Sequence, residues 1–262
     1  MRDEFVRRSV LPSGLRVVTE SMPGARSVTI GMWVGSGARD EVDEQSGASH
    51  FLEHLLFKGT EERTALDIAA AVESVGGEMN AFTTHEQTVF YVRLPDTQLE
   101  RAIDILADVV WRPAFRPDDV EAERQVILEE IGMRDDTPDD LVHDLFTHAH
   151  FPDHPLGREV LGTSETIAAM PRDGIASYHA AHYEPHNIVV AAAGKQAGSG
   201  TWRLLESDGA RVTVLPGRQT RIVLRAHSRI KGSFMMGFSV DSEWKIVSVD
   251  VPEAAAAQEA RP

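Results

Sequence analysis

Two histidines and one glutamate fall at a spacing that a helix would bring together. Segment 47–60 has small residues at its start, apolar residues around His50, Glu53 and His54, and Gly59 near its end. These features predict a short buried helix. Because helical residues three and four positions apart share a face, the three side chains would project into the same space.

Such a group can bind and use a metal. Two imidazoles four residues apart suit Zn²⁺, which binds imidazole nitrogen at about 2.0–2.1 Å and keeps a position open for water in catalytic sites. The carboxylate between them can accept a proton from that water once the metal has lowered its pKa. The order His-x-x-Glu-His is that of the inverted zincins. A core helix with satisfied histidines is the alternative, since the intervening apolar residues would suit it equally well.

A second group of acidic residues lies on a later helix. Pro117 predicts the helix start, and apolar residues follow in helical register at Val120, Ile127 and Ile131. Glu123 and Glu130 are two turns apart, close to this apolar stripe. A carboxylate there is costly unless it is paired or ligates a metal. In so acidic a protein, the alternative is that both carboxylates are solvated.

Composition limits the class of protein. The 262 residues include 42% hydrophobic residues, enough for one large or two modest domains, and the net charge of −15 argues against binding to nucleic acid. No segment matches a signal peptide or a membrane span, so we expect a cytoplasmic protein that does not bind membranes. The chain has no cysteine, so any zinc must be held by histidine and carboxylate.

The surrounding elements predict an α+β fold with a mostly antiparallel sheet flanked by helices. Residues 14–20 and 27–34 are predicted as a pair of strands, residues 78–94 as a hairpin, and residues 187–193 as a buried strand. Helices are predicted at 64–75, 99–110, 139–147 and 172–182. Short connections forbid parallel crossovers within each pair of strands, so we expect each pair to be antiparallel.

The sequence around His50 and Glu130 resembles the pitrilysin/insulinase family of inverted zincins, and within it the catalytic subunit of mitochondrial processing peptidase and its small bacterial relatives. Further matches follow in the family's order: Phe57-Lys58-Gly59-Thr60, Asn80-Ala81-Phe82-Thr83 with Glu86-Gln87-Thr88, Pro155-Leu156-Gly157-Arg158 with Gly162, and His182-Tyr183 leading into 187–194. The resemblance covers about residues 8–194. It implies the family's metallopeptidase α/β roll.

The resemblance also implies a zinc-dependent metalloendopeptidase with one Zn²⁺ per chain. The ligands would be His50, His54 and Glu130, which lies 76 residues after His54. Glu53 would be the general base that takes a proton from the zinc-activated water, and Glu123 would support the ligands. In relatives, a peptide or unfolded segment lies as an added strand along the edge that corresponds to Asn80, Ala81 and Phe82.

The resemblance ends near Gly194. Relatives continue with a second domain of like fold, whereas this chain continues with a flexible-looking junction and short β-like runs. Residues 195–262 hold ten Lys/Arg and seven Asp/Glu, a net of +3, which leaves −18 for residues 1–194. We therefore expect a catalytic domain over 1–194, and over 195–262 a divergent tail or partial second module with a frayed C-terminus.

Two functions remain open from the sequence. The first is a zinc endopeptidase that acts on peptides or unfolded segments, with a second subunit able to supply the missing C-terminal half. The alternative is a non-catalytic or truncated subunit that contributes the same domain to a peptidase assembly. The set His50, Glu53, His54 and Glu130 favours the first, because a scaffold has no physical need to aim these groups at one point.

Overall fold

The structure, a computed structural model, describes residues 6–195 in full and the backbone of five later strands. The later strands are β7 (Arg203–Leu205), β8 (Arg211–Val214), β9 (Thr220–Ser228), β10 (Gly232–Val240) and β11 (Ile246–Asp250). They pair in the order β11-β10-β9-β8-β7, and every pair is antiparallel. The β-like runs predicted after residue 210 are therefore strands. The expected frayed end at 253–262 lies outside the described residues.

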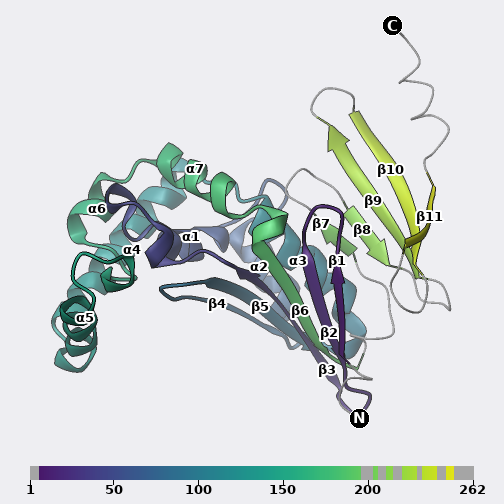
Figure 1. Ribbon diagram of the computed structural model, residues 1–262, viewed down its shortest axis with the longest axis horizontal. Helices are drawn as coiled ribbons and strands as arrows, with labels where there is room; N and C mark the ends of the chain where they lie inside the picture. Colours follow the sequence, from purple (N-terminus) through teal and green to yellow (C-terminus); the bar gives the residue numbers. More distant parts are fainter. Residues whose placement is uncertain are drawn as a thin grey trace, which may run out of the picture.

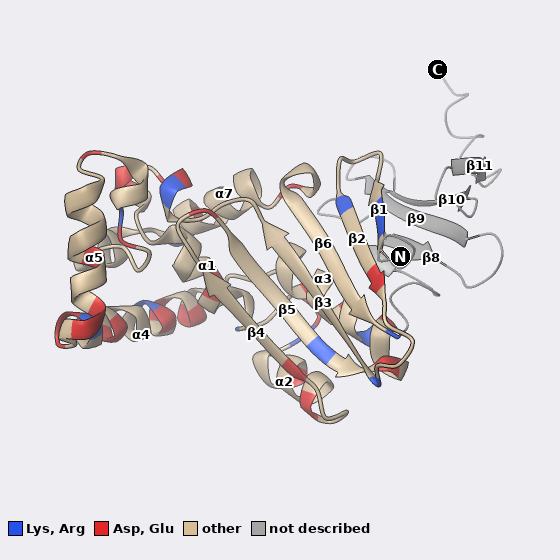
Figure 2. Cartoon of the chain, turned by 60° about the horizontal axis from the view of Figure 1, so that its bottom comes forward, with Lys and Arg blue, Asp and Glu red and all other residues tan. Residues whose placement is uncertain are grey.

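One six-stranded sheet forms the base of the fold in residues 6–195 (Figure 2). Its strands are β1 (Val6–Val10), β2 (Arg16–Ser21), β3 (Ser27–Val34), β4 (Glu78–Thr83), β5 (Thr88–Pro95) and β6 (Ile188–Gly194), in the order β1-β2-β6-β3-β5-β4. Four of the five strand pairs are antiparallel. The prediction of an α+β fold with a mostly antiparallel sheet is confirmed.

The position of β6 corrects one predicted pairing. Strands β2 and β3, expected to pair with each other, are separated by β6, which runs parallel to β2 and antiparallel to β3. Residues 188–194 alternate between buried and half-buried positions and carry three alanines. A strand with this small, apolar pattern suits the centre of a sheet, where both edges are hydrogen-bonded. Its partners lie more than 150 residues away, so no local connection reveals them.

Seven α-helices complete the described region (Figure 1). They are α1 (Ala48–Leu56), α2 (Ala65–Glu73), α3 (Leu99–Trp111), α4 (Pro117–Asp135), α5 (Pro138–His150), α6 (Ser164–Ala169) and α7 (Arg172–His182). Helix α3 is buried along most of its length and packs on β3 and β5, while α1 packs on β4 and β5. No helix within the described ranges is long and apolar enough to cross a membrane.

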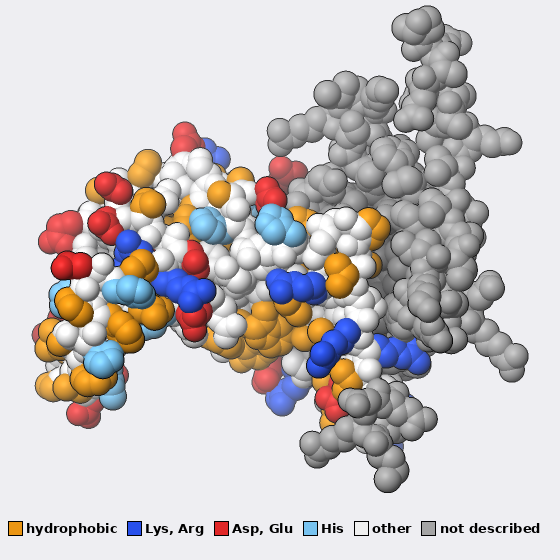
Figure 3. Space-filling model, viewed as in Figure 1, with side chains coloured by type: hydrophobic (Ala, Val, Ile, Leu, Met, Phe, Trp, Pro, Cys, Tyr) orange, Lys and Arg blue, Asp and Glu red, His pale blue; other side chains and the backbone are white. Residues whose placement is uncertain are grey.

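Helix α5 is longer than predicted and leaves an apolar face exposed. His148 and His150, which follow the predicted helix 139–147, belong to its last turn, and the ring of His150 stacks on Phe146 with centroids 5.7 Å apart. Figure 3 shows apolar and histidine side chains gathered at the end of the molecule that α5 forms. The exposed apolar residues of α5 are Val142, Leu145 and Phe146. Exposed apolar clusters of this kind commonly mark contact surfaces.

The segment that follows α1 is fixed to α3 by a buried carboxylate. Asp108 is fully buried, accepts a hydrogen bond from Thr60 Oγ1 at 2.8 Å and forms ion pairs with Arg63 and Arg112. Removing one partner of such a group would leave a buried charge uncompensated. These contacts therefore fix the position of the segment after α1 relative to α3.

Candidate metal centre

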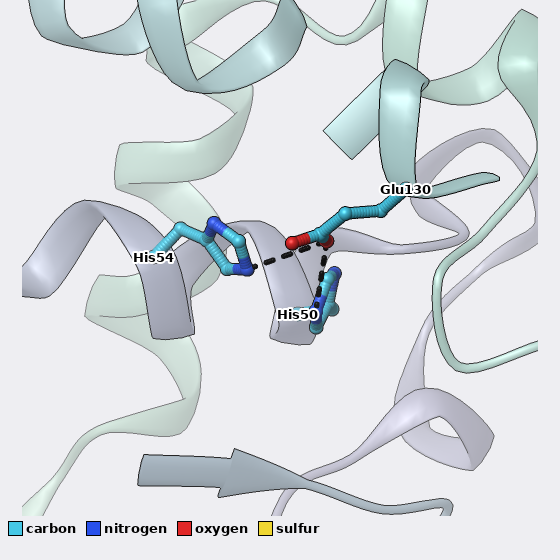
Figure 4. A group of neighbouring side chains, drawn as sticks. All are labelled: His50, His54 and Glu130. Carbon is cyan, nitrogen blue, oxygen red and sulfur yellow. Dashed lines mark ion pairs between the residues drawn. The ribbon is translucent and has the colours of Figure 1, made fainter. Parts of the chain in front are cut away.

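Helix α1 presents a polar and an apolar side. Phe51, Leu52, Leu55 and Leu56 are buried in the core, while His50, Glu53 and His54 lie on the half-buried side. Helix α4 packs against α1 and carries Glu130 toward the two imidazoles (Figure 4). The helical spacing of the sequence and the crossing of two helices thus produce one cluster.

The three side chains approach one another closely enough to share an ion. Oε2 of Glu130 lies 3.7 Å from Nε2 of His50 and 3.6 Å from Nε2 of His54. A tetrahedral ion with bonds of about 2.0–2.1 Å places its ligands roughly 3.3–3.4 Å apart, so these separations suit zinc. Within the described part of the chain, this is the one group of three or more such side chains whose ligand atoms lie within 4.8 Å of one another.

The two histidines are held in different ways. Nδ1 of His54 lies 3.1 Å from Oε2 of Glu123, whose other oxygen lies 2.6 Å from Nζ of Lys58. Glu123 is 5% exposed, so the alternative that it is solvated is wrong for this residue. An acceptor at Nδ1 favours the tautomer with the proton there, which leaves Nε2 available to a metal.

His50 has no such acceptor among the described residues, since its Nδ1 is buried without a hydrogen-bond partner. Burial, with a smaller effect from His54, lowers the pKa of His50 to about 4. The imidazole is therefore neutral near pH 7, which is the form that binds metals. The donor set of two imidazoles and one carboxylate, without cysteine, suits zinc.

Glu53 lies on the same side of α1 and is held by the sheet. Its Oε2 accepts a hydrogen bond from Thr83 Oγ1 at 2.6 Å, and burial raises the pKa of its carboxyl group. Thr83 ends strand β4, so this bond joins α1 to the edge of the sheet. Glu129, the neighbour of Glu130, is exposed and is not part of the cluster.

The three residues expected to bind substrate lie on β4, the edge strand of the six-stranded sheet, beside α1. The N–H of Ala81 donates to Oδ1 of Asn80 at 2.8 Å, and Phe82 is 42% exposed. The backbone N–H of Ala81 is thus hydrogen-bonded to the side chain of the preceding residue. The arrangement gives a strand edge next to the cluster, where an extended chain could add.

Two cavities adjoin these elements. One of about 480 Å³ lies between α4 and α5, and its lining includes Glu130, Asp140, Asp144 and Arg134. The other, of about 300 Å³, lies between α2 and β4 and is mostly apolar, with Phe57, Ile68, Val72 and Met79 in its lining. Sequence reasoning did not single out Asp140 or Asp144, whose position follows from the packing of α5 on α4.

Comparison with known proteins gives consistent results. The family model described as Insulinase (Peptidase family M16) matches residues 16–164. An uncharacterized zinc protease of Mycobacterium leprae is 49% identical over 232 residues, which cover 88% of this chain and 52% of that protein. Because this match is longer than segment 1–194, it extends into residues 195–262.

Two further similarities are more distant. The probable mitochondrial-processing peptidase subunit beta of Arabidopsis thaliana is 39% identical over 188 residues, 72% of this chain and 35% of that protein. The crystal structure of a protease from Helicobacter pylori matches with a TM-score of 0.70 and 27% identity, over 72% of this chain and 46% of that one. The chain thus spans about half the length, or less, of the relatives described here.

Proposed function

The chain belongs to the insulinase family, peptidase family M16, and from this we propose that it forms the zinc-binding, catalytic part of a metalloendopeptidase. The observation that carries the proposal is the convergence of His50, His54 and Glu130 from two helices, with Glu53 on the same side of α1. Relatives named as zinc proteases support the choice of metal.

We assign one zinc ion to His50, His54 and Glu130. Zinc bound there supplies a Lewis acid that polarises a peptide carbonyl and lowers the pKa of water. Glu53 accepts the proton of the attacking water and returns it to the leaving amine. Thr83 holds Oε2 of Glu53 through its hydrogen bond, which fixes the orientation of this carboxylate.

The substrate we propose is a peptide or an unfolded segment in extended form. It would add to the edge of β4 along Asn80, Ala81 and Phe82, where the N–H of Ala81 would exchange its bond to Asn80 for one to the substrate. Side chains of an extended chain alternate in direction, so they would reach the cavities beside this strand and beside Glu130.

About half of the relative from Mycobacterium leprae is not matched by this chain, and such a further part would affect activity. We propose that a second domain or subunit completes the substrate-binding chamber, and that the exposed apolar face of α5 helps to bind it. Productive cleavage requires the scissile bond to be held in place, which zinc ligands alone do not achieve. We therefore expect zinc binding by this chain alone and cleavage that is weak without the second half.

The test is zinc content by plasma emission, together with cleavage of a quenched peptide by the parent and by Glu53→Gln. We expect both proteins to hold zinc. We expect the rate of cleavage to be lower by about two or more orders of magnitude in the variant. A chain with zinc but no cleavage, even with the second half supplied, would favour the alternative of a non-catalytic subunit. A parent without zinc would contradict the proposed metal site.

A further inference from the structure

Helix α1 begins at a residue that cannot cap it with a side chain. Its N-cap is Gly47, with φ of +91°, and a Cβ at this position would lie 2.7 Å from the carbonyl oxygen of Leu161. Glycine is required here by both backbone conformation and space. The first amides of a helix still need acceptors, which a side chain at the N-cap usually provides.

A buried carboxylate from outside the helix provides them instead. Oε2 of Glu41 accepts the N–H of Gly47 at 2.7 Å, and Oε1 accepts the N–H of Ser49 at 2.7 Å. Glu41 is 3% exposed, a position where an acidic side chain is costly to bury. Burial raises its pKa to about 7, while the two backbone hydrogen bonds and the charge of Arg158 act in the opposite direction.

A second contact, from helix α7, holds the same turn. Oγ of Ser49 lies 2.9 Å from the hydroxyl of Tyr178, which in turn lies 2.9 Å from Oγ of Ser36. Tyr178 belongs to α7 and is 2% exposed, and Ser36 follows strand β3. Ser49 is thus bonded through its backbone to Glu41 and through its side chain to Tyr178.

The residue after Ser49 is His50, the imidazole whose Nδ1 has no acceptor among the described residues. Its partner His54 is oriented by Glu123 through the ring. We propose that Glu41 is a positioning residue for the metal centre, which places His50 by capping the amides of Gly47 and Ser49. The inference rests on the proposed zinc site and adds a residue that acts on one ligand through the backbone.

Loss of Glu41 should therefore affect the two histidines unequally. Without its carboxylate, two amides of the first turn lose their acceptors, and a nine-residue helix has few other bonds to maintain that turn. His50 lies in this turn, whereas His54 lies in the last turn and keeps its bond to Glu123. The site would hold zinc with one ligand poorly placed.

The test measures zinc affinity of the full chain by competition with a chromophoric chelator at pH 8, where Glu41 is ionised. We expect Glu41→Ala to weaken zinc binding by roughly tenfold or more, in the range found for residues that orient ligands. Glu41→Gln should weaken zinc binding less than Glu41→Ala does. The glutamine amide keeps one oxygen that can accept from one of the two backbone N–H groups, while its NH₂ group faces the other. Glu44→Gln is the matched control, since this exposed glutamate lies three residues away.

Two further measurements separate positioning from a loss of stability. The visible spectrum of the Co²⁺-substituted protein reports ligand geometry, and we expect it to change in Glu41→Ala and not in Glu44→Gln. Urea unfolding of the metal-free proteins gives the fraction of each protein that is folded, and each zinc affinity is calculated for that folded fraction. If Glu41→Ala does not fold, Glu41→Gln decides, and it is expected to weaken zinc binding.

The outcomes are distinguishable. Folded Glu41 variants with the parent's affinity and Co²⁺ spectrum would overturn the role of Glu41 and leave the proposed zinc site intact. A parent chain that binds no zinc would overturn the proposed site itself, and with it the role of Glu41.

Discussion

Glu123 orients His54 through the ring nitrogen that does not face Glu130. Its Oε2 lies 3.1 Å from Nδ1 of His54, and its Oε1 lies 2.6 Å from Nζ of Lys58. Lys58 keeps Glu123 paired in a position where the carboxylate is almost fully buried. The two ends of the imidazole thus have separate partners, one structural and one facing the proposed metal.

The first prediction concerns this contact. Glu123→Ala should weaken zinc binding by roughly 10–100-fold, because His54 loses the acceptor that sets its tautomer and ring orientation. The measurement is chelator competition at constant pH. Glu129→Ala, an exposed glutamate of the same helix, should leave the affinity within about twofold of the parent. Equal affinities for all three proteins would contradict the role of Glu123.

A second prediction separates the base from the metal. Thr83→Val removes the hydroxyl that donates to Glu53 and nearly preserves side-chain volume. We expect kcat to fall by roughly tenfold, a fraction of what a general base contributes, with zinc affinity unchanged. Thr83→Ser keeps the hydroxyl and should retain most of kcat. A drop in zinc affinity, or an equal loss in the serine variant, would show that Thr83 acts by another route.

A third prediction concerns the cavity beside Glu130. With Glu130 assigned to the zinc ion, Asp140 and Asp144 still outnumber Arg134 in its lining, so it should favour a basic substrate side chain. Peptides that differ only by arginine or the neutral citrulline should be cleaved with different kcat/KM. Asp140→Asn should reduce this preference by roughly two- to fivefold, as expected for a solvent-accessible ion pair. Cleavage of both peptides with the same kcat/KM would exclude this cavity from charge recognition.

A fourth prediction concerns acid stability. Burial lowers the pKa of His179 to about 4, and its Nε2 lies 2.8 Å from the carbonyl oxygen of Val110. Between pH 6.5 and 4 the unfolded chain binds a proton that the folded chain does not, so stability falls as pH falls through this window. His179→Gln keeps an N–H donor without titrating. It should reduce the loss of unfolding free energy between pH 7 and 4.5 by about 2 kcal/mol.

The control for His179 is His186→Gln, because His186 is two-thirds exposed. Urea unfolding at both pH values gives the difference directly. If His179→Gln loses as much stability in acid as the parent does, His179 is not the group responsible.

Much of this architecture follows from local patterns. The apolar spacing in 48–56 and 117–131 predicts α1 and α4, and the alternation in 27–34 predicts β3. These patterns are local because each helix or strand buries one face. The choice of Glu130 rests on the family resemblance and its spacing from His54, and of Glu129 and Glu130 only Glu130 lies in the cluster.

The remainder depends on contacts between distant segments. The place of β6 between β2 and β3 is set by sheet assembly, and β1 has too few buried residues to be predicted. Glu41 reaches the amides of α1 from a turn, and Thr83 reaches Glu53 from another element. Neither contact has a sequence signature, because a side-chain hydrogen bond across the fold depends on where two backbones approach each other.

The most direct test is X-ray absorption of the zinc-loaded chain, combined with zinc content in the parent and in Glu130→Ala. We expect one zinc per chain with two imidazoles and one carboxylate at about 2.0–2.2 Å, and loss of most zinc in the variant. Glu129→Ala should keep the parent's zinc. Full zinc occupancy without Glu130, or a zinc shell lacking the two imidazoles, would contradict the assignment of His50, His54 and Glu130 as ligands.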